Sequence, residues 1–315
     1  MLSILLAVYS LLFIFITWNR FYWGLYIFFL LLPTYLIRFS IGPLPTTLLE
    51  IMLLIIFTIW IIKYNKNIII QLKLQFSKNY NYTLIFAILI FLLAATISIF
   101  TSADIKSALG EWKAFYVEPI ILFFILVTSH KLQVTKNFVK NILFALILSG
   151  LTTSILAIYQ HFTGWMVPWD FWQNGNSFRI TGWWGFPNGV GLFLSPLVLL
   201  SLFLINKKDW KTWVLPIVFI PLGILSVIFA KSTGGLVGII GGFGLLLLLY
   251  KKTRWWTIGL TTIAVIGLFT FPQLSEIKKE ILLQDRSGQI RISMWGEATE
   301  FLSDNPILGA GLASY

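Results

Sequence analysis

Long apolar stretches dominate the chain, and short polar segments separate them. Crossing a hydrocarbon core of roughly 30 Å takes about 20 apolar residues in a helix, which satisfies its own backbone hydrogen bonds. The pattern predicts ten membrane-spanning helices, at Leu2–Trp18, Phe21–Ile37, Leu44–Ile62, Tyr82–Phe100, Phe115–Ser129, Phe138–Gln160, Pro187–Ile205, Trp213–Ala230, Thr233–Tyr250 and Trp255–Phe271. We therefore expect an all-α transmembrane bundle over residues 1–272, followed by an extramembrane segment over residues 273–315.

The composition supports a membrane protein. Apolar residues make up 58% of the 315 positions and charged residues only 11%, and the mean hydropathy is +0.86. A soluble domain needs far more charge on its surface. The net charge of +11 does not indicate nucleic-acid binding, because the basic residues fall in short clusters between apolar runs.

These basic clusters predict the orientation in the membrane. Cytoplasmic loops carry an excess of lysine and arginine. Four alternate connections are basic, and their cations are Lys63, Lys66, Lys73 and Lys78; Lys131, Lys136 and Lys140; Lys207, Lys208 and Lys211; and Lys251, Lys252 and Arg254. The intervening loops, and the tail after Phe271, are therefore expected on the extracytoplasmic side.

The outer loop between residues 161 and 187 contains five tryptophans and a single strong cation, Arg179. Tryptophan favours the membrane interface on energetic grounds alone, so anchoring explains the aromatic residues equally well. Arg179 precedes the turn Phe186, Pro187, Asn188 and Gly189, where the chain re-enters the bilayer. A guanidinium there can bind a phosphate group at headgroup depth.

The tail has the pattern of an amphipathic helix. Its apolar residues recur at helical spacing, with Ser287 as the expected N-cap and Pro306 as the stop; they are Ile290, Met294, Ala298, Phe301 and Leu302. Arg291 and Trp295 are four residues apart and share a face. A solvated arginine lying along an indole ring is the alternative interpretation of that pair.

Ionisable residues at the ends of predicted spans are functional candidates by default, because burying a charge in lipid is costly. Glu118 beside Pro119 can contact substrate or pair with a cation on another helix, such as Lys231. Glu50 is expected to face water at a helix start. His130 and His161 lack any metal-site or general-base arrangement, and with no cysteine in the chain we expect no metal and no cofactor.

One helix carries a small-residue repeat. Gly234, Gly238 and Gly242 recur every four residues, which puts a smooth groove on one face where a neighbouring helix can approach closely.

Three stretches together resemble the O-antigen ligase and polymerase superfamily of the bacterial cell envelope: FRITGWWGFPNGVGLFLSPLVLL from Phe178, AKSTGGLVGIIGGFGLLLLL from Ala230, and IRISMWGEATEFLSDNPILGAGLASY from Ile290. The wider pattern, including LPTTLLEIMLLII and LGEWKAFYVEPIILFF, is also similar.

The resemblance implies a glycosyltransferase of the inner membrane. Family members move a glycan from undecaprenyl diphosphate to an acceptor hydroxyl at the outer face, without nucleotide sugars. The ligases of lipopolysaccharide biosynthesis use lipid A core, and the polymerases use another carrier-linked repeat unit. By resemblance, Arg179 and Arg291 would bind the diphosphate, with Lys231, Glu118 and Trp295 as possible supporting residues.

Two departures from the family affect this assignment. The family histidine expected to act as general base has no counterpart between Ile290 and Tyr315, so we expect it beyond Tyr315 and expect the chain to be an N-terminal portion. Where many relatives have serine and arginine, Ser232 is followed by Thr233. Family members also reach the large loop after an odd number of spans, so one of the first two segments is expected to be re-entrant or merged.

Two other functions remain open. A transporter or flippase would show charged or broken helices at mid-membrane depth and repeated half-structures, and the sequence has neither. A structural membrane protein would leave the outer arginines without a function.

Overall fold

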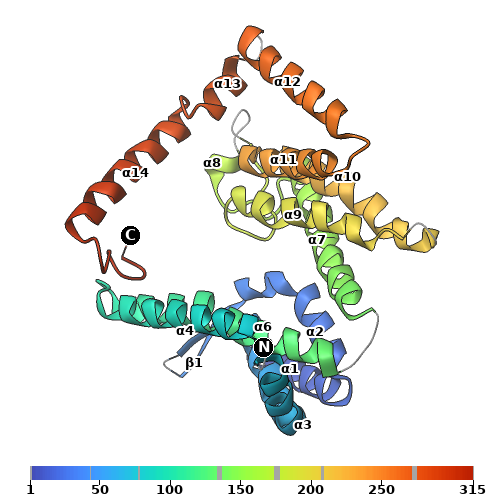
Figure 1. Ribbon diagram of the computed structural model, residues 1–315, viewed down its shortest axis with the longest axis vertical. Helices are drawn as coiled ribbons and strands as arrows, with labels where there is room; N and C mark the ends of the chain where they lie inside the picture. The colour runs from blue at the N-terminus through green and yellow to red at the C-terminus, as the bar shows by residue number, and fades with distance from the viewer. Residues whose placement is uncertain are drawn as a thin grey trace. The chain divides into compact units, whose positions relative to one another are not determined.

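The computed structural model describes residues 2–42, 44–76, 79–132, 137–173, 178–206, 209–271 and 275–314. Helices make up most of them, which confirms the predicted all-α class (Figure 1). The α-helices are α1 (Leu2–Asn19), α2 (Phe21–Leu30), α3 (Leu48–Phe76), α4 (Asn79–Phe100), α5 (Ile105–Glu111), α6 (Glu118–Leu132), α7 (Phe138–Thr163), α8 (Asp170–Gln173), α9 (Asn188–Ser201), α10 (Val214–Phe229), α11 (Thr233–Leu249), α12 (Arg254–Thr270), α13 (Ser275–Ile281) and α14 (Arg286–Asp304).

Shorter elements connect these helices. They are the 3₁₀ segments η1 (Leu32–Leu36), η4 (Leu202–Leu204) and η5 (Trp210–Trp213), the π-helical segment η2 (Trp112–Val117), and the antiparallel strands β1 (Arg38–Ile41) and β2 (Leu44–Thr47). The chain forms two compact units: Met1–Leu72 with Leu122–Phe243, and Lys73–Ile121 with Gly244–Tyr315. The predicted domain boundary between residues 272 and 273 lies outside the described residues.

Most helices begin and end within a few residues of the predicted spans, but two predictions were wrong in extent. The predicted span Phe21–Ile37 is a helix only as far as Leu30. Its ten residues cover about 15 Å, half of a hydrocarbon core. Pro33 follows in a 3₁₀ turn, and the chain then enters the β-hairpin instead of continuing across.

The helix α3 differs at both ends from the predicted span Leu44–Ile62. The first four residues of the predicted span belong to β2, so α3 begins only at Leu48. At the other end, α3 runs to Phe76, well past Ile62. Lys63 thus lies within the helix, where its ammonium group donates to the Trp18 carbonyl and sits 5.0 Å from the centroid of that ring. Lysine and glutamine are good helix formers, so the basic segment continues the helix instead of breaking it.

Three helical segments are long and apolar enough to cross a membrane, by length and composition, within the described part of the chain. They are Thr83–Phe100, Phe138–Thr163 and Trp210–Phe229. Four shorter apolar helices accompany them, at Ile4–Asn19, Phe21–Leu30, Asn188–Leu204 and Thr233–Leu249. The total of nine or ten spans stays a prediction.

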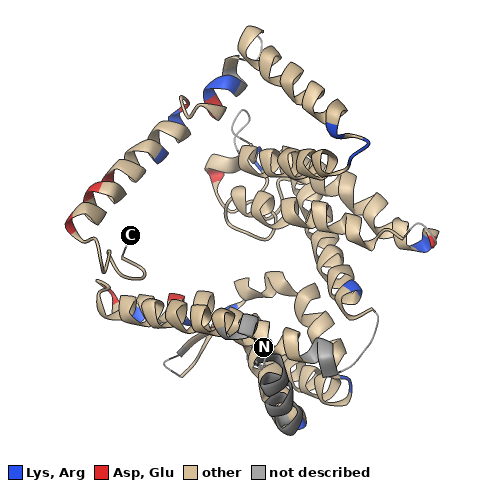
Figure 2. Cartoon of the chain, in the orientation of Figure 1, with Lys and Arg blue, Asp and Glu red and all other residues tan. Residues whose placement is uncertain are grey.

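Large apolar side chains are exposed along these helices. On α4, for example, Phe86 is 65% exposed and Phe100 77%. In a soluble protein such surfaces would aggregate, whereas lipid covers them in a bilayer. Charged side chains lie chiefly near helix ends and on α13 and α14 (Figure 2). The chain is therefore an integral membrane protein.

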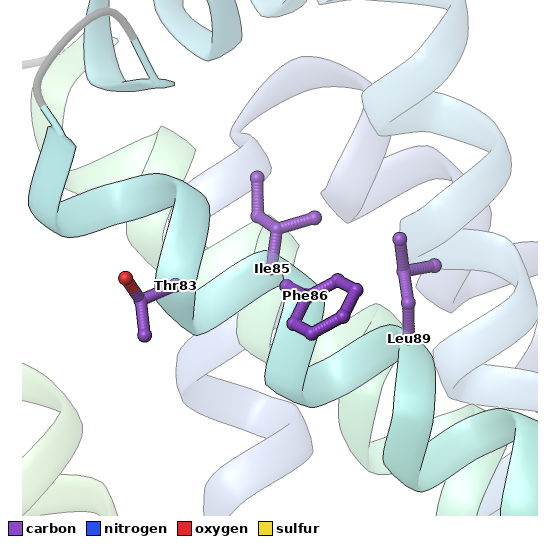
Figure 3. Close-up of a pocket in the computed structure, with 4 residues that line it drawn as sticks. All are labelled: Thr83, Ile85, Phe86 and Leu89. Carbon is purple, nitrogen blue, oxygen red and sulfur yellow. The ribbon is translucent and has the colours of Figure 1, made fainter.

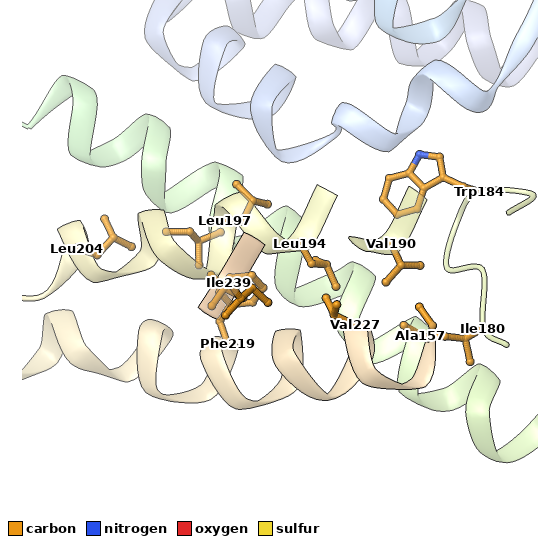
Figure 4. Close-up of a cluster of buried hydrophobic side chains, with 13 residues drawn as sticks. Ala157, Ile180, Trp184, Val190, Leu194, Leu197, Leu204, Phe219, Val227 and Ile239 are labelled. Atoms are coloured by element: carbon orange, nitrogen blue, oxygen red, sulfur yellow. The ribbon is translucent and has the colours of Figure 1, made fainter. Parts of the chain in front are cut away.

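The core of the first unit lies where α7, α9, α10 and α11 meet (Figure 4). Phe219 on α10 is fully buried, and its ring approaches Gly150 of α7 so closely that a Cβ there would lie 2.8 Å from it. Leu194 and Val198 of α9 and Ile239 of α11 complete the contact. This cluster packs the helices whose connecting segments contain Arg179 and Lys231.

The small-residue face predicted on α11 is only partly used. Gly242 packs against Leu199, but a Cβ on Gly234 or Gly238 would meet no described atom within 4 Å. The closest approach to another backbone is made by Gly235, whose added Cβ would lie 3.0 Å from the Cα of Gly191 on α9. The packed face of α11 thus includes Gly235, the buried Ile239 and Gly242, instead of Gly234, Gly238 and Gly242.

A π-helical turn connects α5 to α6. Proline has no N–H and crowds the carbonyl four residues earlier, so Pro119 disrupts the regular ladder. The backbone N–H of Glu118 instead donates to Lys113, five residues back. The predicted span Phe115–Ser129 is thus the second half of a longer helical rod that starts at Ile105.

Candidate functional site

Arg179 lies in the loop between α8 and α9, and three of the described hydrogen bonds hold its side chain. Its Nε donates to the Ala230 carbonyl at 2.8 Å, and Nη2 donates to the Lys231 carbonyl at 3.0 Å and to Asn188 Oδ1 at 3.1 Å. A guanidinium has five donors, so these contacts direct three of them to the protein. The structure thus brings Arg179 and Lys231 together, as their assignment to one site requires.

The carbonyls that Arg179 contacts belong to Ala230 and Lys231, the C-cap turn that follows α10. Ser232 N donates to Val227 O and Lys231 N donates to Ile228 O, which is the pattern of a Schellman motif. Lys231 occupies its left-handed position with φ +47°, where glycine is usual. Arg179 therefore also stabilises a helix end, whose carbonyls carry partial negative charge.

The tryptophans near this arginine occupy different positions. The Arg179 guanidinium carbon lies 5.1 Å from the centroid of the Trp172 ring, and the Arg179 N–H donates to the Trp172 carbonyl at 3.0 Å. Trp184 is only 6% exposed and packs on Gly189, where a Cβ would lie 2.8 Å from the ring. Trp165 and Trp169 are more than half exposed, as interfacial anchors would be. The aromatic residues thus include both a cation–π partner and anchors.

Gln160 organises this loop, and the sequence interpretation used it only as the end of a span. It is fully buried near the end of α7. Its Nε2 donates to the Gly182 carbonyl at 3.0 Å, and its Oε1 accepts from Thr181 N at 3.2 Å and Gly182 N at 2.8 Å. A glutamine near the end of a mostly apolar helix was the available signal.

His161 takes a structural position. Its ring stacks on Phe229 with centroids 3.6 Å apart and an interplanar angle of 8°, and it meets Phe178 edge-on. Its buried Nδ1 has no hydrogen-bond partner among the described residues. The side chain of His130 lies outside the described residues.

An apolar groove of about 360 Å³ lies on the other side of the turn that follows Arg179. Leu32, Pro33, Tyr35, Leu49, Trp184, Phe186, Gly189, Leu192 and Phe193 line it. Gly189 in the groove follows Asn188, the Arg179 partner, directly in sequence. A second hollow, of about 490 Å³, is lined on α4 by Thr83, Ile85, Phe86 and Leu89 (Figure 3). It presents no ionisable group among its described residues, so it offers no catalytic chemistry.

The second predicted arginine, Arg291, is on α14 in the other unit. Its side chain is exposed and makes no hydrogen bond, ion pair or cation–π contact among the described residues, and Trp295 is 60% exposed. The helix ends at Asp304, ahead of Pro306 as predicted, but the predicted N-cap Ser287 was wrong. Asp285 caps the helix instead, and its carboxylate accepts from Ser287 N and Gly288 N at 3.1 Å. A carboxylate makes stronger bonds to these N–H groups than a hydroxyl does.

Glu118 begins α6 in the same unit as Arg291, whereas Lys231 and Arg179 belong to the first unit. Both the pairing of Glu118 with Lys231 and the joint site of the two arginines therefore stay predictions. The position of Glu50, in contrast, follows from contacts within one unit. Its carboxylate accepts from Thr46 Oγ1 at 2.6 Å and from Thr47 N at 3.1 Å at the start of α3. It is a capping residue at the helix start, where the sequence placed it.

The chain after α14 docks on the corner between α4 and α5, within the second unit. Leu312 N donates to Ser98 O at 3.1 Å, and Ala313 N donates to Glu111 Oε2 at 3.0 Å. Gly311 has φ +81°, and a Cβ there would lie 2.5 Å from Ser102 N. At the same corner, hydrogen bonds from Ser107 hold the pKa of Asp104 below its usual range.

The fold and this site define the class of protein: a polytopic helical membrane protein with an arginine site at a loop beside an apolar groove. Residues 217–315 match the family model described as O-Antigen ligase. Residues 217–315 therefore carry an O-antigen ligase domain, in agreement with the predicted resemblance, and this domain lies at the C-terminal end of the chain. Lys231, Arg291 and Trp295 fall inside the matched range, and Arg179 and Glu118 fall outside it.

One curated relative is similar over most of the chain. It is an uncharacterized protein of Haemophilus influenzae, 26% identical over 77% of this chain and 61% of its own length. The chain thus spans less than two thirds of the relative that it matches. No solved structure matches. That this chain is the N-terminal portion of a longer protein stays a prediction.

Proposed function

We propose that the chain belongs to an enzyme that transfers a glycan from undecaprenyl diphosphate to an acceptor hydroxyl at the outer face of the bacterial inner membrane. The observation that carries the proposal is the position of the Arg179 guanidinium, which is anchored one residue from an apolar groove through Asn188 and Gly189. A lipid diphosphate has both a charged and an apolar part, and this arrangement suits both.

The proposed reaction needs charge stabilisation at the leaving group. The acceptor oxygen attacks the anomeric carbon, the bond from that carbon to the diphosphate oxygen breaks, and the diphosphate leaves with the bonding electrons. Fixed cations stabilise the developing charge without needing to reorganise. Arg179 is held in place by three contacts, and Arg291 and Lys231 would add positive charge.

A general base must take the proton of the acceptor hydroxyl. By resemblance this is a histidine beyond Tyr315. Glu118 and Trp295 are retained as possible supporting residues, the first for pairing with a cation and the second for contact with the glycan or lipid. The reaction as proposed uses no metal and no cofactor.

The test compares transfer by single variants of the natural full-length protein in membranes. We expect Arg291→Ala to lower transfer from the lipid diphosphate by about 10²-fold or more, as removal of one charge-stabilising donor does elsewhere. Arg286→Ala is the matched control, because Arg286 is an exposed arginine on the same helix. It should transfer normally.

Arg179 needs a conservative variant, because it also stabilises the end of α10. Arg179→Lys keeps the charge but not the fork of donors, so we expect transfer to fall while membrane insertion stays intact. Unchanged transfer by both the Arg179 and the Arg291 variants would refute the proposal. Supplying lipid A core or a second carrier-linked repeat unit as acceptor distinguishes ligation from polymerisation.

A further inference from the structure

A buried amide side chain controls the backbone beside the candidate arginine. The three hydrogen bonds of Gln160 all go to the main chain of Thr181 and Gly182. The loop at these residues belongs to no helix or strand, so its buried N–H and C=O groups need side-chain partners. Gln160 satisfies two donors and one acceptor at once.

Among charged and apolar side chains of this size, none meets all three demands. A glutamine offers N–H donors on one atom and a carbonyl acceptor with two lone pairs on the other. An ionised glutamate could accept from the two N–H groups but could not donate to the Gly182 carbonyl. A leucine could do neither, and leaving these buried N–H and C=O groups unpaired is unfavourable.

The bound backbone lies two residues from Arg179. Ile180, which stands between Arg179 and the bound Thr181, is fully buried, as is Thr181 itself, so this stretch has little freedom to move independently. Gly182 adopts φ +59°, which turns the chain there. The backbone direction at Thr181 and Gly182 therefore determines where the Arg179 side chain can reach.

We propose that Gln160 is a positioning residue, which fixes the 179–182 backbone so that the Arg179 guanidinium is presented to a lipid diphosphate. The identity of the substrate in this inference, a lipid diphosphate, rests on the proposed function. A merely structural role would change the amount of folded protein, whereas a positioning role changes the Michaelis constant for the lipid diphosphate in the protein that is folded.

The experiment uses Gln160→Leu, which conserves size but removes all three hydrogen bonds. The matched control is Ser226→Ala on α10, because the Ser226 hydroxyl is also buried and bonds to the α7 backbone, at Ser154 O, but does not contact the loop. Each is made in the natural full-length protein, and transfer is measured as KM and kcat for an undecaprenyl diphosphate-linked glycan in membranes.

A second readout does not depend on catalysis. Residues 1–315 contain no cysteine, so Thr181→Cys provides the one reporter thiol in this part of the protein, at a fully buried residue whose hydroxyl has no partner among the described residues. The rate of maleimide labelling of this thiol measures how often the loop opens.

We expect Gln160→Leu to raise KM by about tenfold, the loss of about 1.4 kcal/mol of binding, and to raise the labelling rate by a similar factor. Ser226→Ala should change neither. An unchanged KM, or labelling as slow as in the parent, overturns the proposal. If the leucine variant does not insert, Gln160→Met, which also lacks all three hydrogen bonds, decides by the same two measurements, with unchanged values again overturning the proposal.

Failure of the proposed function gives a different result. If the parent protein transfers no glycan at all, the labelling arm still decides the role of Gln160. Faster labelling in Gln160→Leu alone supports a role in ordering the Arg179 loop, and equal labelling in all variants refutes it.

Discussion

Arg179 directs part of its hydrogen-bonding capacity to the last carbonyls of α10, so a single guanidinium stabilises a helix end and stands in the candidate site. The sequence singled it out as the one strong cation in an aromatic loop. It could not show the carbonyl partners, which come from a helix about 50 residues later. Gln160 was missed for the same reason, since its partners depend on how the loop folds back.

Lys231 allows a test of strain at this helix end. With φ +47°, its backbone has the conformation that costs an L-residue roughly 1–2 kcal/mol. Lys231→Gly should be more stable than Lys231→Ala by roughly 0.5–1 kcal/mol after the entropy cost of glycine, and thermal unfolding in detergent measures the difference. Both variants lose the same side chain, so equal stability would contradict the assigned Schellman motif. If Lys231 supports binding, both should lose transfer equally.

At the scale of helices and strands, the caps show how far a sequence pattern can be read. The chain contains Thr47 followed three residues later by Glu50, which is the pattern of a capping box. Glu50 N donates to Thr47 Oγ1 at 3.2 Å, and Thr47 N donates to the Glu50 carboxylate. At α14 two candidate caps were two residues apart, and Asp285 rather than Ser287 took the position.

The capping box at α3 predicts a position-dependent effect of one substitution. Thr47→Ala removes a hydroxyl that accepts from the first turn, and should destabilise the protein by about 1 kcal/mol. Thr58→Ala makes the same change inside the same helix, where the hydroxyl only bonds to the Leu54 carbonyl of its own helix. We expect that control to be neutral or slightly stabilising in thermal unfolding, because alanine is the better helix former. Equal losses at both positions would argue against the capping box.

At the scale of the whole molecule, contacts between segments far apart in the sequence decide where the segment after α14 lies. Within the second unit, Gly311 and its neighbours contact the α4 end more than 200 residues earlier. Ser314 Oγ lies 3.2 Å from Ser102 Oγ and accepts from Ala103 N at 2.9 Å. The segment after α14 is thereby tied to the end of a predicted membrane span.

This docking can be tested by crosslinking, since the chain has no cysteine. The pair Ser102→Cys and Ser314→Cys should form a disulfide under oxidising conditions, because the side-chain oxygen atoms are 3.2 Å apart. Adding Gly311→Ala should lower the crosslinked fraction several-fold, because a Cβ there would lie 2.5 Å from Ser102 N and φ is +81°. Gly296→Ala on α14 is the control and should leave crosslinking unchanged, as a Cβ there meets no described atom within 4 Å. Crosslinking that survives Gly311→Ala would contradict the docked arrangement.

The sequence alone determined the membrane class, the approximate position of most helices and the residues with unusual chemistry, because each depends on local composition and period. It also carried the family resemblance. Tertiary structure decided the rest: the early end of the helix at Leu30, the contact at Gly235 instead of Gly234, and the partners of Arg179 and Gln160. These features depend on which segments meet in space. Every residue has a backbone carbonyl, so the residue type does not show which carbonyl will accept a hydrogen bond or where two helices will approach closely.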